Sequence, residues 1–257
     1  MLSSLEKIAL TLWATSALLV IIFYFSETPP IFKILYSEIT QFVTAISCSL
    51  ACFRTALSRT SNSHDKKGWL FIAIAMTLWA TGQAIYGYCY VVTREIPPNP
   101  YYSDFAFIGM VVFFIMGLIV FHKGAVKDLP AIPKGGKIIA LIFLYVTLIT
   151  GFISQNYSFS GLSFFVALCY NILDPIILYI SILLFFSLIG EKNGMTWIFM
   201  VIGILLYIVA NQVYYYLDYR QAYASGSPND TLWILSFCFI ATAAIIAHKK
   251  HIEPSYP

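Results

Sequence analysis

Charged side chains are scarce in this chain. Of its 257 residues only 11% are Asp, Glu, Lys or Arg, whereas 60% are hydrophobic. A soluble globular domain carries about a quarter charged residues. No polar stretch is longer than about 15 residues, so no separate soluble domain fits anywhere in the chain. The composition therefore predicts a single transmembrane domain over residues 1–257, with the lipid bilayer of the cell membrane as its surroundings.

Familiar catalytic and cofactor signatures are also missing. The sequence has no HExxH, GxSxG, P-loop or GxGxxG pattern, and no lysine falls in the middle of an apolar segment to carry a retinal Schiff base. Its five cysteines all lie in apolar segments, where thiols usually act as small hydrophobic side chains. We therefore expect no enzymatic activity, no cofactor, no metal site and no nucleic-acid partner.

Long apolar runs are what the chain has instead. A membrane-spanning helix needs about 20 mainly apolar residues. Prolines and short polar runs separate the segments that meet this requirement. These segments cover residues 7–26, 33–55, 69–93, 104–122, 137–154, 161–189, 196–218 and 231–248. The sequence thus predicts an all-α, polytopic membrane bundle of about eight transmembrane helices.

The basic residues predict how this bundle crosses the membrane. Lysine and arginine concentrate in cytoplasmic loops of membrane proteins. If the amino terminus is cytoplasmic, 12 of the 15 basic residues lie inside, and only Lys33, Arg94 and Arg220 lie outside. Losing or merging one helix would destroy this alternation. We therefore predict that both termini are cytoplasmic.

Polar groups inside the expected helices are the candidates for a binding site, because such groups are costly in lipid unless they are paired or hydrated. Trp79, Gln83, Tyr86 and Tyr90 recur at steps of 4, 3 and 4, as do Tyr207, Asn211, Tyr214 and Asp218. These steps place each set on one face of its helix. The two faces line a shared outward-opening cavity, or their amides bond helix to helix. The candidate ligand-binding residues are Glu38, Gln83, Tyr86, Tyr90, Asn171, Asp174, Tyr207, Asn211 and Tyr214.

Three aspartates hold particular positions. Asp174 precedes Pro175 near the middle of its segment. Proline interrupts the helical hydrogen bonds, and a carboxylate beside a broken helix often marks a binding or coupling site. Asp174 therefore has a functional role or stabilises a kink. Asp104 and Asp230 open two segments, where they cap the helices or contact a ligand at the cavity mouth.

The order of several motifs resembles a known family. Gly82-Gln83 is followed by the loop Pro97-Pro98-Asn99-Pro100-Tyr101-Tyr102-Ser103-Asp104, and later by Tyr170-Asn171-Ile172-Leu173-Asp174. Over residues 69–248 this is similar to the multipass amino-terminal sensory region of prokaryotic signalling proteins with diguanylate cyclase or histidine kinase outputs. The resemblance implies helices that lead into a cytoplasmic output domain, and no such domain follows before Pro257.

The resulting hypothesis is a membrane sensory or receptor module. It would bind a small, partly apolar ligand in the outer half of the bundle and relay to a cytoplasmic signalling partner or within a homodimer. One alternative is a small transporter or an ion or proton channel that uses Asp174. Another is an accessory subunit of a larger membrane complex, in which the polar faces are contact surfaces.

Overall fold

The computed structural model describes residues 4–60, 63–93, 97, 100–125, 132–154, 161–188, 194–220 and 222–252. Within these residues all regular structure is helical, and eight helices are long and apolar enough to cross a membrane. The predicted fold class, an all-α polytopic bundle, is confirmed. The helices are α1 (Ser4–Phe25), α2 (Pro30–Leu57), α3 (His64–Thr93), α4 (Tyr102–Ala125), α5 (Lys134–Ser154), α6 (Leu162–Leu188), α7 (Gly194–Tyr219) and α8 (Asp230–Ile252).

Most of these helices extend past the apolar segment that predicted them. α3 begins at His64 and takes in a polar first turn, because the helical hydrogen bonds continue where the chain leaves the apolar run. α2 begins with Pro30. Proline lacks a backbone N–H, and this costs no helical hydrogen bond because the N–H groups of the first turn have no acceptor within the helix. Arg94, Lys127 and Lys192, which were counted for the orientation, lie outside the described residues. The orientation stays a prediction.

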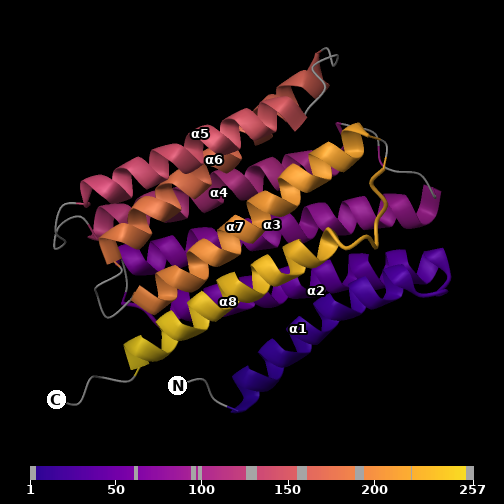
Figure 1. Cartoon of the computed structure of the whole chain (residues 1–257). Coiled ribbons are helices and arrows are strands. Elements are labelled where there is room, and N and C mark those ends of the chain that lie inside the picture. Colours follow the sequence, from indigo (N-terminus) through magenta and orange to yellow (C-terminus); the bar gives the residue numbers. More distant parts are fainter. Residues whose placement is uncertain are drawn as a thin grey trace.

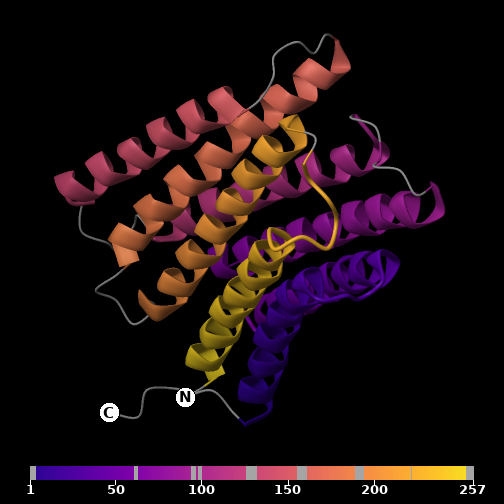
Figure 2. The same cartoon turned by 45° about the vertical axis from the view of Figure 1, so that its right-hand side comes forward.

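Six of the helices form a closed ring. In contact order the ring runs α2, α3, α4, α6, α7, α8 and back to α2. α1 packs outside the ring against α8 and α2, and α5 packs outside it against α6 and α7. α1 begins and α8 ends at the same end of the bundle (Figures 1 and 2). We call this the termini end, and the opposite end the far end.

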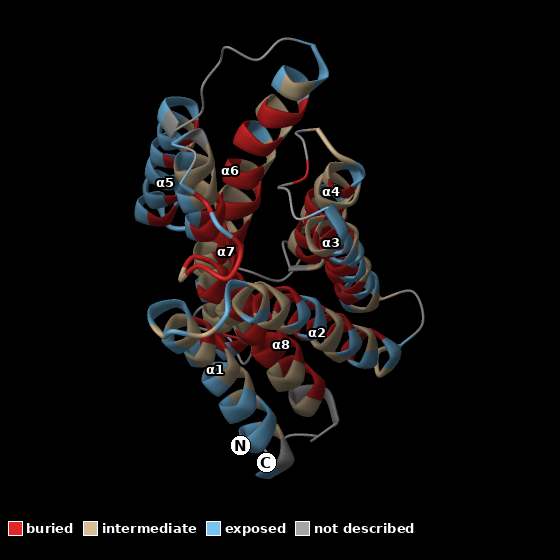
Figure 3. Ribbon diagram, turned by 90° about the vertical axis from the view of Figure 1, so that its right-hand side faces the viewer, coloured by how far each residue is buried: buried red, intermediate tan, exposed pale blue. Residues whose placement is uncertain are grey.

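Burial follows this arrangement. Only 11% of the apolar window of α1 is buried, against 67% for α8. Figure 3 shows α1 and α5 mostly in the colours of exposed and intermediate residues, whereas the buried residues gather on the inward faces of the ring. α8 contacts α7, α2 and α1, and its inner turns carry the small buried residues Ala241, Ala243, Ala244 and Ala247. In lipid the hydrophobic effect does not drive helices together, and small side chains let their backbones pack closely instead.

Aromatic side chains fill the middle of the ring. Phe237 on α8 is fully buried, and its ring centroid lies 4.4 Å from that of Trp79 on α3 in an edge-to-face arrangement. Trp79 also packs at 5.7 Å against Phe107 of α4. Phe237 thus joins α8 to the α3–α4 side of the ring.

We expect Phe237→Ala to lower the free energy of unfolding by about 3–5 kcal/mol, because it leaves a cavity where α8 meets Trp79. Phe165→Ala on α6 is the matched control, since that ring is 59% exposed on the outside of the bundle. Thermal or denaturant unfolding of both variants in lipid–detergent micelles checks this. Equal losses for the two variants would show that the ring centre is not the packed core.

Candidate functional site

A buried carboxyl group near the far end joins α2, α3 and the segment between α7 and α8. Glu38 on α2 is 6% exposed. Gln83 of α3 donates from Nε2 to Glu38 Oε2 at 2.6 Å, and the Ser225 hydroxyl donates to Oε1. A Cβ atom at Gly87 would lie 2.8 Å from Oε2, so the glycine leaves the space that the carboxyl group occupies. Gln83 therefore holds Glu38 against α3, where Gly87 leaves room for it, and Ser225 bonds it to the segment between α7 and α8.

A second buried carboxyl group lies at the first residue of α8. Asp230 is 0% exposed and accepts three hydrogen bonds. Its donors are the Ser37 hydroxyl at 2.6 Å, the Gly226 N–H at 2.8 Å and the Tyr223 hydroxyl at 3.0 Å. These three donors all lie outside α8, so the carboxyl group ties α8 to α2 and to the preceding segment, which is a wider role than the expected helix cap.

The segment that supplies these donors, residues 222–229, folds back into the bundle. Ser225, Gly226, Ser227 and Asn229 are buried, and Asn229 donates to the carbonyl oxygen of Ala210 at 3.2 Å. Gly226 has φ +87°, a conformation that favours glycine, and it lies directly on the backbone of Lys33. We call residues 222–229 the inner segment. It closes the far end over Glu38 and Asp230.

Tyr223 of the inner segment lies among the other polar groups of the far end. Burial, above all, raises the pKa of the Tyr223 phenol, and nearby acidic groups and phenols raise it further. Those neighbours are Asp230, Tyr86, Glu38 and Tyr214. The phenol therefore stays neutral and acts as a donor to Asp230. Together, Ser37, Glu38, Gln41, Gln83, Tyr223, Ser225, Gly226 and Asp230 make up what we call the far-end network.

A third carboxyl group, Asp174 on α6, is paired across the ring interior. Asn211 of α7 donates to Asp174 Oδ2 at 2.7 Å, and Asn211 in turn accepts a bond from the Trp233 indole N–H of α8 at 2.9 Å. Asp174 is 0% exposed, and its Oδ1 has no hydrogen-bond partner in the described structure. These two hydrogen bonds connect α6, α7 and α8.

Aromatic rings connect the hydrogen-bonded side chains of Asp174, Asn211 and Trp233 to the far-end network. Tyr214 packs at 4.7 Å against Tyr223 and at 5.9 Å against Trp233. Tyr86 stacks on Tyr90 at 6.4 Å, and the buried Tyr86 hydroxyl has no hydrogen-bond partner in the described part of the chain. Carboxyl groups, amides and aromatic rings that contact one another therefore occupy the far half of the ring interior.

Asp104 also bonds between two helices. It is the third residue of α4, and its Oδ2 accepts the N–H of Tyr101 at 2.7 Å, which is the return bond of a capping box. Its Oδ1 accepts the Tyr170 hydroxyl of α6 at 3.1 Å. The expected capping role is therefore joined by a link from α4 to α6.

The structure brings together most of the residues that the sequence pointed to. Gln83 pairs with Glu38, Asn211 pairs with Asp174, and the rings of Tyr86, Tyr90 and Tyr214 lie in the same half of the bundle. Asn171 differs, because its Oδ1 would lie 2.5 Å from a Cβ at Gly151. Asn171 therefore faces α5, away from the centre of the ring.

Sequence reasoning missed the partners from irregular structure. Ser225 stands in a segment that the sequence marks only as a break between two helices, and Tyr223 directly precedes that break. Ser37 lies in α2 and has no distinguishing pattern around it. The helical periodicity that marked Gln83 and Asn211 has no counterpart in such a segment. The one available signal was Asp230 itself, at the start of an apolar helix.

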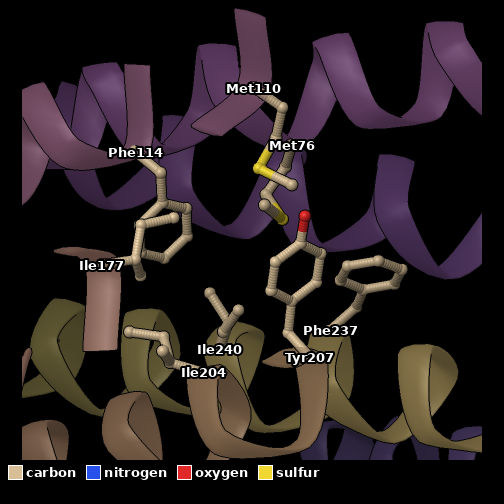
Figure 4. A pocket seen from close by; sticks show the side chains of 8 residues that line it. All are labelled: Met76, Met110, Phe114, Ile177, Ile204, Tyr207, Phe237 and Ile240. Atoms are coloured by element: carbon tan, nitrogen blue, oxygen red, sulfur yellow. The ribbon is translucent and has the colours of Figure 1, made fainter. Parts of the chain in front are cut away.

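Tyr207 belongs to a different feature, a small void at mid-depth. The void measures about 10 Å³, about the space that one water molecule needs. Figure 4 shows the Tyr207 hydroxyl pointing toward Met76 and Met110, one helical turn from Asn211. The lining residues come from five helices of the ring and are Met76, Met110, Phe114, Ile177, Ile204, Tyr207, Phe237 and Ile240.

Among the described residues no group of three or more His, Cys, Asp or Glu side chains is placed to hold a metal ion. All five cysteines are free thiols. The chemistry that the far half offers is therefore hydrogen bonding by carboxyl groups, amides and hydroxyls, beside aromatic faces. No family model, no curated protein and no solved structure matches the chain.

We expect Gly87→Ala to destabilise the bundle, because the new methyl group displaces Glu38 from its donors and a broken buried hydrogen bond costs about 1–3 kcal/mol. Gly109→Ala on α4 is the control, since its Cβ would make an ordinary 3.4 Å contact with Leu78. That variant should gain up to about 1 kcal/mol from helix propensity. Melting temperatures in nanodiscs compare the two. A stabilising Gly87→Ala would show that Glu38 is not held against α3.

Proposed function

We propose that the chain is a non-enzymatic sensory or receptor module of the cell membrane. It binds a small, partly apolar ligand in the far half of the ring and passes the change along α8 to a partner at the termini end. The basic residues place the termini end on the cytoplasmic side in this proposal. The resemblance of residues 69–248 to prokaryotic sensory regions agrees with it.

The observation that carries the proposal is that α8 is bonded at both ends. At its first residue, Asp230 belongs to the far-end network. Near its last turn, Lys249 forms an ion pair with Glu6 of α1, and Arg59 donates from Nη2 to the carbonyl oxygen of Ala247 at 2.8 Å. A shift of this buried helix therefore alters contacts at both ends of the bundle at once.

The inner segment supplies the second state that a receptor requires. A ligand changes a conformational equilibrium only if it binds the two states with different affinities. The donors from Tyr223, Ser225 and Gly226 come from a connecting segment, and a ligand with its own donors can replace them. The closed form seen here would then be the unliganded state, with Asp230 as the point where displacement of the segment acts on α8.

The proposal is tested by a thermal-stability screen of the chain in nanodiscs. The probe is a library of small molecules with cationic, neutral and anionic members. We expect at least one member to raise the melting temperature. At a hundredfold excess over its Kd, such a ligand adds about 2.7 kcal/mol to the free energy of unfolding. Gln83→Ala should abolish the shift, because Gln83 holds the Glu38 carboxyl group in position against α3 and does not belong to the segment that the ligand replaces.

Thr81→Ala serves as the control on the same helix, since Thr81 is exposed and bonds only within α3. A binding member should also change hydrogen exchange in the last turns of α8. No binding member, or binding that Gln83→Ala leaves intact, would contradict the proposal.

A further inference from the structure

Within the described residues, the two carboxyl groups of the far-end network have no basic partner. The hydrogen bonds to Glu38 and Asp230 come from neutral donors: one amide, three hydroxyls and one backbone N–H. Lys33 lies on α2 five residues before Glu38, but its ammonium donates to the carbonyl oxygens of Tyr24 and Ser26 at 2.9 and 2.8 Å. Negative charge that develops on these carboxyl groups therefore has no cation among the described residues that bonds to it.

A buried hydroxyl beside these carboxyl groups has no partner in the described structure. The Tyr86 phenol oxygen is out of contact with solvent and makes no hydrogen bond. Tyr86 lies one helical turn from Gln83 on α3, and Gln83 bonds to Glu38. Leaving a buried polar group unpaired costs free energy. The hydroxyl therefore marks a position where a polar atom of a bound molecule completes the structure.

A cluster of aromatic rings adjoins the carboxyl groups, since Tyr223 donates to Asp230 and also packs on Tyr214. Tyr223 and Trp233 both pack on Tyr214, at 4.7 and 5.9 Å between ring centroids. The faces of tyrosine and tryptophan attract cations, most strongly where water is excluded. Carboxyl groups and aromatic faces together favour a positively charged group and disfavour an anion.

The inner segment indicates what else the ligand must provide. Its Ser225 hydroxyl, Gly226 N–H and Tyr223 hydroxyl all donate to carboxyl oxygens. A molecule that replaces this segment has to offer N–H or O–H donors of its own, or the carboxyl groups are left unpaired. A primary ammonium group brings three N–H donors and the missing positive charge.

From these four observations we infer that the far-end site takes a primary organic ammonium compound, whose N–H donors replace those of the inner segment on Glu38 and Asp230. The inference rests on the proposed receptor function and adds the chemical class of the ligand. It also makes residues 222–229 a competitor that is built into the chain.

Isothermal titration calorimetry on the full chain in nanodiscs tests the charge requirement. The probes are n-butylammonium, n-butanol and n-butyrate, which share an alkyl chain and differ in charge and donors. We expect saturable binding of n-butylammonium, about tenfold or more weaker binding of n-butanol, and none of n-butyrate. Equal binding of the amine and the alcohol, or no binding of the amine, would overturn the inference.

Two variants locate the binding. Glu38→Gln should weaken n-butylammonium by about tenfold, since it replaces the carboxylate with a neutral amide of the same shape. Ser225→Ala should strengthen it by about threefold, because the inner segment then loses a donor and competes less well. Glu27→Gln is the control, because this glutamate is exposed between α1 and α2 at the same end. If Glu38→Gln does not fold, Ser225→Ala decides, and unchanged or weaker binding in it counts against the inference.

The two proposals fail in different ways. Binding of a neutral or anionic library member that depends on Gln83 would leave the receptor function standing and refute the ammonium class. An absence of any binding member would refute both.

Discussion

An unpaired polar group costs several kcal/mol in a hydrocarbon environment, and this constraint shapes the chain at every level. Because the backbone must bond to itself there, all the regular structure described is helical. The buried carboxyl groups of Glu38, Asp174 and Asp230 follow the same rule, since each accepts at least one hydrogen bond. Gln83 bonds to Glu38, Asn211 bonds to Asp174, and Asp230 collects three donors, so each carboxyl group is matched with neutral donors from a neighbouring element.

The way these pairs are distributed gives the bundle two different ends. Carboxyl groups and amides join the ring helices in the far half, where the inner segment closes over them. The middle of the ring is aromatic and apolar around Trp79 and Phe237. At the termini end, side chains of α2 donate to backbone carbonyl oxygens of α8; the Thr55 hydroxyl, for example, donates to the carbonyl oxygen of Ala244 at 2.9 Å. α8 is the element that these three layers share, which is why a change at Asp230 has a route to the other end.

Hydropathy was enough to predict the eight helices, because each span holds about 20 mainly apolar residues and the breaks are marked by proline and charge. Helical periodicity also identified Gln83 and Asn211 as inward-facing amides. It did not say which carboxyl group each would meet, since the choice depends on the order of helices around the ring. Asn171 shows the limit: it lies on the same helix as Asp174, yet it faces α5 at Gly151.

The inner segment could not be predicted for a different reason. Serine, glycine and proline between two apolar runs are typical of an exposed turn. Whether such a turn stays outside or folds inward depends on distant residues, here the Glu38 carboxyl group that accepts from Ser225 and the Lys33 backbone that contacts Gly226. No local pattern around Ser225 or Gly226 carries that information.

The proposed receptor function depends most on the inner segment being a closed, hydrogen-bonded part of the far half. Hydrogen–deuterium exchange of the unliganded chain in nanodiscs measures this directly through the backbone amides of Gly226 and Ser227. Both residues are buried, and their N–H groups donate to Asp230 at 2.8 Å and to the carbonyl oxygen of Ala224 at 3.1 Å, so we expect these two amides to exchange as slowly as those in the buried turns of α8. Exchange at the rate of an exposed loop would contradict the account.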